Sequence, residues 1–232
     1  MISLGRGVWT TGLILAASVA LSARAVAACP AMPNLPPLEV NVQLLHPEIV
    51  YHHDIDLFGL PKVQHGTEHP PPGATLFGLT KLVDSFQAGF QTITLPVAGE
   101  HFCTWLEKVD AVLGDKVMDV YIAEDYPPDS CEYKVTLAHE NTHVRFNLEA
   151  LEEWLPRIKA ALTEGAKKNF PASFPASPTK EQLDHAMLDS VAPVFAQMNA
   201  DMAKRNGSID TIENYRREIA KCDNWMRPKK TQ

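Results

Sequence analysis

The segment His139-Glu140-Asn141-Thr142-His143 constrains this chain more than any other feature of its sequence. It is an H-E-x-x-H pattern within residues 131–155, CEYKVTLAHENTHVRFNLEALEEWL, whose apolar spacing predicts an α-helix. On a helix, residues four apart lie on one face, about 6 Å from each other. His139 and His143 can therefore share one tetrahedral metal ion, with Glu140 beside it as a general base. The pattern predicts the metal site of a zinc hydrolase.

The surroundings of the motif favour a buried helix. Apolar residues accompany both histidines on their own face, and a second apolar stripe lies on the opposite side at Leu137, Val144 and Leu148. Core histidines held by hydrogen bonds are the alternative interpretation. Burying two imidazoles and a carboxylate without partners costs a few kcal/mol. Because one metal ion satisfies both rings together, we favour the metal site.

Two histidines leave a catalytic zinc ion one protein ligand short. Asp184 is our predicted third ligand, because it falls on the apolar face of a helix expected over residues 179–205, where a carboxylate needs a partner. Asp189, Glu164 and His185 are alternatives. Glu149 has the spacing of the last ligand in the longer motif H-E-x-x-H-x-x-G-x-x-H. If the helix continues, however, its side chain points into the narrow polar strip of the helix, so we reject it.

The N-terminus predicts export. Residues 1–27 combine Arg6, an apolar run from Val8 to Leu21 and the small-residue site Ala25-Val26-Ala27, as in a cleaved signal peptide. No later stretch is apolar enough to span a membrane, so we expect a periplasmic or secreted protein. Cleavage would remove two of the 21 basic residues and none of the 28 acidic ones, which changes the net charge from −7 to −9. This charge argues against nucleic acid as a partner.

Four cysteines, an even number in an exported chain, predict two disulfides. Three connectivities are open, and we expect Cys103–Cys131 and Cys29–Cys222. Val26-Ala27-Ala28-Cys29 also resembles a lipoprotein cleavage site, but a lipid on Cys29 would leave one thiol unpaired.

The order of the predicted elements indicates an α+β fold in one domain, residues 28–232. Short strands are expected over residues 38–122, which we take to be an antiparallel region, and helices over residues 132–224. Pro156 is expected to break or kink the motif helix, Asn206-Gly207 to end the long helix, and Asp210 to cap the last one. The strand at residues 116–125, just before the motif helix, is a candidate wall for a peptide cleft.

In these features the chain resembles an uncharacterised bacterial family of secreted proteins described as zinc-dependent proteases. The likeness extends from about Glu39 to Trp225 and is carried by CEYKVTLAHENTHV and by the closing DMAKRNGSIDTIENYRREIAKC. The resemblance implies a zincin-like domain in which the H-E-x-x-H helix follows a β region, and a peptide or protein substrate.

The leading hypothesis is therefore an exported, Zn²⁺-dependent metallopeptidase, monomeric by default, with Glu140 as general base. Tyr215, His185 and Arg216 are candidate donors to the oxyanion, by their chemistry alone. Two alternatives stay open. One is a non-catalytic zinc-binding envelope or interaction protein, and the other is a zinc amidase that acts on cell-wall amides.

Overall fold

The computed structural model describes residues 29–63, 75–82, 85–97 and 101–226. Seven strands and four helices follow one another along the described chain, most of the strands before the long helices. The predicted α+β class is thus confirmed at this level. The predicted signal peptide, residues 1–27, lies outside the described residues.

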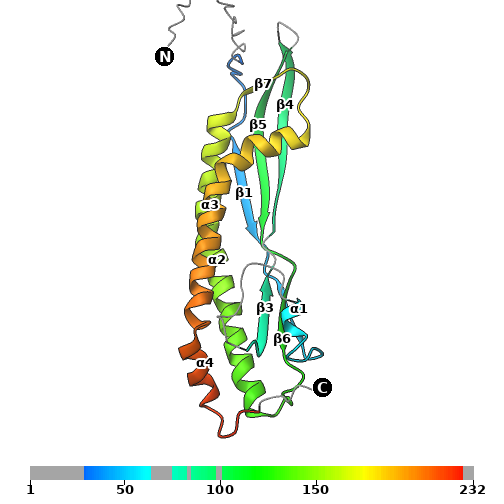
Figure 1. Cartoon of the computed structure of the whole chain (residues 1–232). Coiled ribbons are helices and arrows are strands. Elements are labelled where there is room, and N and C mark those ends of the chain that lie inside the picture. The colour runs from blue at the N-terminus through cyan, green and yellow to red at the C-terminus, as the bar shows by residue number, and fades with distance from the viewer. Residues whose placement is uncertain (1–28, 64–74, 83–84, 98–100, 227–232) are drawn as a thin grey trace, which may run out of the picture.

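Three stretches of chain each pass through two sheets, which gives both sheets the same strand order (Figure 1). The first stretch contains β1 (Glu39–Leu44) and β2 (Glu48–His52), the second β3 (Gly78–Leu82) and β4 (Phe86–Val97), and the third β5 (His101–Leu113) and β6 (Val117–Ile122). One sheet has the order β1-β5-β4 and the other β2-β6-β3. The short helix α1 (Leu60–Val63) follows β2.

The β region is mixed, so the expected purely antiparallel arrangement is wrong. β4 pairs antiparallel with β5 and β3 with β6, but β1 and β2 run parallel to β5 and β6. The third stretch crosses between the sheets at Gly114, where φ is +107° and a Cβ atom would lie 2.5 Å from the Leu45 carbonyl oxygen. Only glycine fits a backbone that is both left-handed and this close to its neighbour.

The motif helix α2 (Cys131–Asn169) spans both sheets, because its 39 residues extend about 58 Å at 1.5 Å per residue (Figure 1). Ser130 caps its N-terminus by accepting a hydrogen bond from the Tyr133 N–H. The expected break at Pro156 is wrong: the helix continues, and Trp154, Ile158 and Leu162 on either side of the proline are buried in the core. This burial outweighs the backbone hydrogen bond that proline removes.

Helix α3 (Lys180–Ile209) packs along α2, and Thr179 and Gln182 form a capping box at its start. It continues through Asn206-Gly207, so the expected end at these residues is wrong, and Asp210 is its C-cap. Thr211, in place of Asp210, caps α4 (Ile212–Ile219). The Pro-rich segment between α2 and α3 contains β7 (Ala172–Phe174), which pairs with β5.

The main core lies between the β1-β5-β4 sheet and the packed helices α2 and α3. This core includes Val109, Ala111 and Leu113 of β5 together with Leu151 and Ile158 of α2. A second cluster packs Met118, Val120 and Ile122 of β6 against Val144 of α2. The motif turn of α2 therefore packs on β6 with one side. Its other side, which carries the two histidines, contacts the end of α3 and α4.

Two disulfides cross-link the described chain, and the pairing predicted from the sequence is wrong. Cys29 is bonded to Cys103 and Cys131 to Cys222, in place of Cys103–Cys131 and Cys29–Cys222. Cys103 lies within β5. Cys131 is the first residue of α2, and its partner Cys222 follows α4. Two disulfides fit an oxidising compartment. Among the described residues, no helix has the length and apolarity needed to cross a bilayer.

Candidate metal centre

His139 and His143 lie one turn apart on α2, and both are buried. Their Nε2 atoms are 3.0 Å apart, and Asp210 Oδ1 lies 3.0 Å from the first and 3.3 Å from the second. In a tetrahedral zinc site with bonds of 2.0–2.2 Å, ligand atoms lie about 3.3–3.6 Å from one another. The three atoms have close to this spacing, so the described residues contain one His-His-Asp group that could hold a metal ion.

Hydrogen bonds on the far side of each ring aim both Nε2 atoms at the same point. His139 Nδ1 lies 3.0 Å from Glu218 Oε2, and His143 Nδ1 lies 3.0 Å from Asn206 Oδ1. These partner oxygens can only accept, so each ring donates from Nδ1, and Nε2 is the nitrogen left to bind a metal. Such outer partners are typical of metal-binding histidines.

A hydrogen bond to a second asparagine, Asn147, fixes the orientation of the Asn206 side chain. Its Nδ2 donates to Asn147 Oδ1 at 2.8 Å, and both amides are buried. Asn147 lies one turn after His143 on the same helix. Because the amide nitrogen is engaged there, the amide oxygen of Asn206 faces the ring of His143.

Asp210 reaches the histidines because it ends α3 as the C-cap, at the turn into α4. Tyr215, one turn into α4, donates its hydroxyl to Asp210 Oδ1 at 2.6 Å. The residue before it, Asn214, donates through Nδ2 to Glu218 Oε1 at 3.1 Å and to the Ile209 carbonyl at 2.9 Å. The short helix thus presents its polar side to the centre.

Glu140 lies beside this group and is also buried, with 4% of its surface exposed. Its Oε2 accepts a hydrogen bond from the Thr80 hydroxyl of β3 at 2.8 Å. A Cβ atom on Gly78 would lie 2.7 Å from Glu140 Oε1 and 2.8 Å from Thr136 Cγ2. The absence of a side chain at Gly78 is what allows α2 to approach β3 at this point.

The electrostatics of the metal-free group are those of tightly coupled opposite charges. Burial lowers the pKa of His139, but the hydrogen bonds that its ring donates to Asp210 and Glu218 outweigh this effect and raise the pKa to about 10. Burial raises the pKa of Asp210, but its contacts with His139 and His143 outweigh that effect and hold it below its ordinary value. Burial raises the pKa of Glu140. The carboxylates that stabilise the positive charge on the histidine rings would also stabilise a bound cation at the same place.

A narrow pocket adjoins the centre on the side of β3. Its polar lining comes from His139, Glu140, Tyr215, Glu218 and Thr136. Its apolar lining consists of Phe77, Val135, Ile219 and Trp225, with Gly78 at the strand. A small group entering the pocket would thus contact both a candidate ligand and the predicted general base.

The third ligand predicted from the sequence, Asp184, does not lie at the centre. Its carboxylate pairs with Lys180 at 2.7 Å in the first turn of α3. The two long helices run antiparallel, so the start of α3 lies by the end of α2 while the motif lies near the start of α2 (Figure 1). The prediction that Asp184 is the third ligand is therefore wrong. Asp210, at the other end of α3, lies beside the two histidines instead.

The remaining sequence candidates fall into two groups. Tyr215 lies at the centre, where it contacts Asp210. His185 and Asp189 are exposed on α3, Arg216 is exposed on α4, and Glu164 pairs with Lys167 at 3.0 Å on the outside of α2. The last four are not brought to the centre.

Sequence reasoning missed Asp210, Glu218, Asn206 and Gly78. Asp210 was interpreted as the cap of the last helix, an ordinary role for an acidic residue at a helix start. The signal that could have found it is the fourth cysteine. Pairing Cys222 with Cys131, eight residues before His139, would have placed the polar segment 210–218 beside the motif.

No family model, curated protein or solved structure matches this chain. The resemblance to secreted zinc-dependent proteases, and the zincin-like fold with it, therefore stays a prediction.

Proposed function

We propose that the protein is a zinc-dependent peptidase that works in an oxidising compartment outside the cytoplasm. The observation that carries the proposal is the convergence of His139 Nε2, His143 Nε2 and Asp210 Oδ1, at 3.0–3.3 Å from one another, beside the buried carboxylate of Glu140.

Zinc is the metal that this donor set suits best. Two imidazoles and one carboxylate are a donor set of catalytic zinc sites, which keep a fourth position for water or substrate. When bound, zinc supplies Lewis acidity, which makes water a better nucleophile at neutral pH and polarises a carbonyl. Mg²⁺ and Ca²⁺ prefer oxygen donors alone.

Glu140 is the proposed general base. Burial raises the pKa of its carboxyl, which suits a group that takes a proton from water and returns it to a leaving amine near neutral pH. The Thr80 hydroxyl holds one carboxylate oxygen, and the lack of a side chain at Gly78 leaves room for the other. Tyr215 acts in this scheme by orienting Asp210.

The strand that an extended peptide would pair with is β3. The sequence had suggested the segment of β6, but β6 is the central strand of its sheet, with β2 and β3 on its two sides. β3 ends the described sheet and carries Gly78 and Thr80 next to Glu140. A substrate strand added at this edge would pass the predicted general base.

The test combines metal content with hydrolysis. The purified chain lacking residues 1–27 is expected to hold about one zinc ion, and His143→Ala and Asp210→Ala to lose it. Glu140→Gln should keep the ion and lose about 10³-fold or more in the cleavage of a peptide library. Asp184→Ala is the matched control and should keep both properties.

Two outcomes would contradict the proposal. Absence of zinc after reconstitution would exclude the metal centre. Zinc without hydrolysis of peptides would leave the non-catalytic zinc-binding protein, or the amidase of cell-wall amides, as the function to test next.

A further inference from the structure

Trp225 forms one wall of the pocket beside the metal centre, although it comes from the C-terminal segment after α4. It lines the pocket together with Phe77, the residue before β3, Val135 of α2 and Ile219 of α4. His139 and Glu140 lie at the same pocket. Any group that fills the space between these apolar side chains therefore lies next to the proposed reacting centre.

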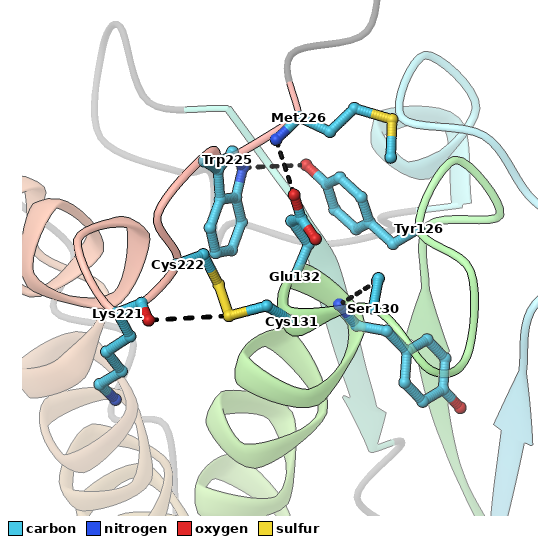
Figure 2. The surroundings of a disulfide bond; sticks show 9 residues. Tyr126, Ser130, Cys131, Glu132, Lys221, Cys222, Trp225 and Met226 are labelled. Carbon is cyan, nitrogen blue, oxygen red and sulfur yellow. Dashed lines mark hydrogen bonds between the residues drawn. A yellow bond between two sulfur atoms is a disulfide. The ribbon is translucent and has the colours of Figure 1, made fainter.

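The segment that carries Trp225 is fixed in place both before and after this residue along the chain (Figure 2). Cys222, three residues earlier, is bonded to Cys131 at the start of α2, and the Met226 N–H donates to Glu132 Oε1 at 2.8 Å. The indole Nε1 donates to the Tyr126 hydroxyl at 3.2 Å.

Aromatic packing completes this restraint. The Trp225 ring centroid lies 5.1 Å from that of Phe77 and 5.7 Å from that of Tyr126, whose side chain is fully buried. The wall is thus rigid, because a side chain restrained by packing, a hydrogen bond and a nearby covalent link cannot move aside at low cost.

The pocket is small, and one of the residues that line it has a hydroxyl group with no hydrogen-bond partner among the described residues. The space between its walls takes about a water-sized group, which is also the approximate size of a methyl group. Thr136, one turn before Glu140, lines the pocket, and its hydroxyl is buried without a hydrogen-bond partner among the described residues. An unpaired buried hydroxyl costs about 1–3 kcal/mol, which a ligand group in the pocket would recover.

We propose that Trp225 determines substrate specificity: it restricts the pocket to a small apolar side chain, such as that of alanine, next to the cleaved bond. The Thr136 hydroxyl hydrogen-bonds the backbone of the same substrate residue. This inference rests on the proposed peptidase function and names its substrate class, peptides with a small apolar residue beside the scissile bond.

Cleavage-site profiling of the zinc-loaded protein is the first test. Wild type should cut library peptides with alanine next to the scissile bond at least tenfold faster than those with leucine. Trp225→Ala should reverse this order, because the enlarged pocket takes the longer side chain, and Trp225→Phe should lie between. Met226→Ala is the matched control, since its side chain is 43% exposed and does not line the pocket.

A binding measurement separates this inference from the proposed function. N-acetyl-alaninamide and N-acetyl-leucinamide are titrated into the same variants, with and without zinc, and the dissociation constants are measured by NMR. Wild type should favour the alanine amide, Trp225→Ala the leucine amide, and Thr136→Val should weaken both by about fivefold without changing the order. These expectations need no turnover, so they can hold or fail whether or not peptides are cut.

An unchanged order of preference in Trp225→Ala, with zinc content intact, would overturn the inference. So would a wild-type protein that binds the leucine amide as tightly as the alanine amide. If Trp225→Ala fails to fold, the same comparison is made with Trp225→Phe. Unaltered selectivity in that variant would also overturn the inference.

Discussion

The two imidazole rings of the centre take their orientation from side chains that are not themselves candidate ligands. Glu218 holds His139, and Asn206, itself held by Asn147, holds His143. Because each ring donates its outer N–H, the inner nitrogens of both rings are the ones left to bind a metal at the same point, once it has displaced any proton there. Without these partners, either ring could turn or change tautomer, and the metal would lose a ligand.

Asn206→Leu removes the acceptor for His143 at nearly constant volume. We expect its zinc affinity to fall about 10- to 100-fold, as for other partners of metal-bound histidines. Competition with a chromophoric chelator measures this. Asn206→Asp keeps an acceptor oxygen and should retain most of the affinity. Equal losses in the two variants would show that the contact with His143 does not matter.

Zinc and protons should compete for the same nitrogen atoms. In the metal-free protein the pKa of His139 is about 10, so its ring holds at pH 7 an extra proton that a metal must displace, and the pKa of His143 is raised by the same neighbouring carboxylates. Apparent zinc affinity should therefore rise between pH 6 and 8, by about tenfold per unit for each proton released. Calorimetry in buffers of different ionisation enthalpy counts these protons. Affinity that is independent of pH would contradict the raised pKa values.

Gly78→Ala tests the close approach of β3 to α2. The new methyl group would lie 2.7–2.8 Å from atoms of Glu140 and Thr136, so one of the two elements must shift. We expect a loss of about 1–3 kcal/mol in unfolding free energy and a fall in hydrolysis, with zinc retained. Gly89→Ala is the control, because its nearest atom, the Asp110 carbonyl oxygen, would lie 3.8 Å away. Chemical denaturation should separate the two variants.

At this scale the sequence predicted the local part of the centre and missed the remote part. His139, Glu140 and His143 share one turn of helix, so their spacing alone brings them together. Asp210 lies 67 residues after His143 and reaches it only through the way α3 returns along α2. Periodicity placed Asp184 on an apolar face, but it could not show which end of α3 meets the motif.

At the scale of elements, patterns predicted which segments form helices and strands better than where those segments end. Most of residues 38–122 formed strands and α2 to α4 formed helices, as expected. Pro156 and Asn206-Gly207 did not act as breaks, because packing of α2 on α3 outweighs the local preference of these residues. Parallel pairing of β1 with β5 brings together residues that are about 70 positions apart in the sequence, and no local sequence pattern indicates this pairing.

Helix α4 depends on its links to the rest of the molecule, because it buries none of its residues. Replacing Cys131 and Cys222 by serine should lower the unfolding free energy by about 2–4 kcal/mol. Zinc affinity should fall as well, since α4 carries Glu218 and Tyr215. The Cys29→Ser, Cys103→Ser variant should lose stability and keep its zinc affinity. Thermal unfolding and chelator competition on both variants make the comparison, and an unaffected affinity in the first would contradict the role of the disulfide.

At the scale of the whole molecule, the centre joins the start of α2 to the end of α3 and to α4, which are far apart in the sequence (Figure 1). A metal that binds only the folded chain stabilises it by mass action, by about 2.7 kcal/mol at a hundredfold excess over Kd. For a domain of this size we expect chelation to lower the Tm by about 5–10 °C. Scanning calorimetry with and without chelator measures this shift. It should vanish in His143→Ala and persist in Asp184→Ala.

The four cysteines are bonded in the order in which they occur, the first with the second and the third with the fourth. In a chain that enters an oxidising compartment from its N-terminus, Cys103 is the first partner that Cys29 meets, and this bond can close before Cys131 arrives. An oxidase that simply joins thiols as they emerge would therefore produce both native bonds. Maturation of this protein should need an oxidant and no disulfide isomerase.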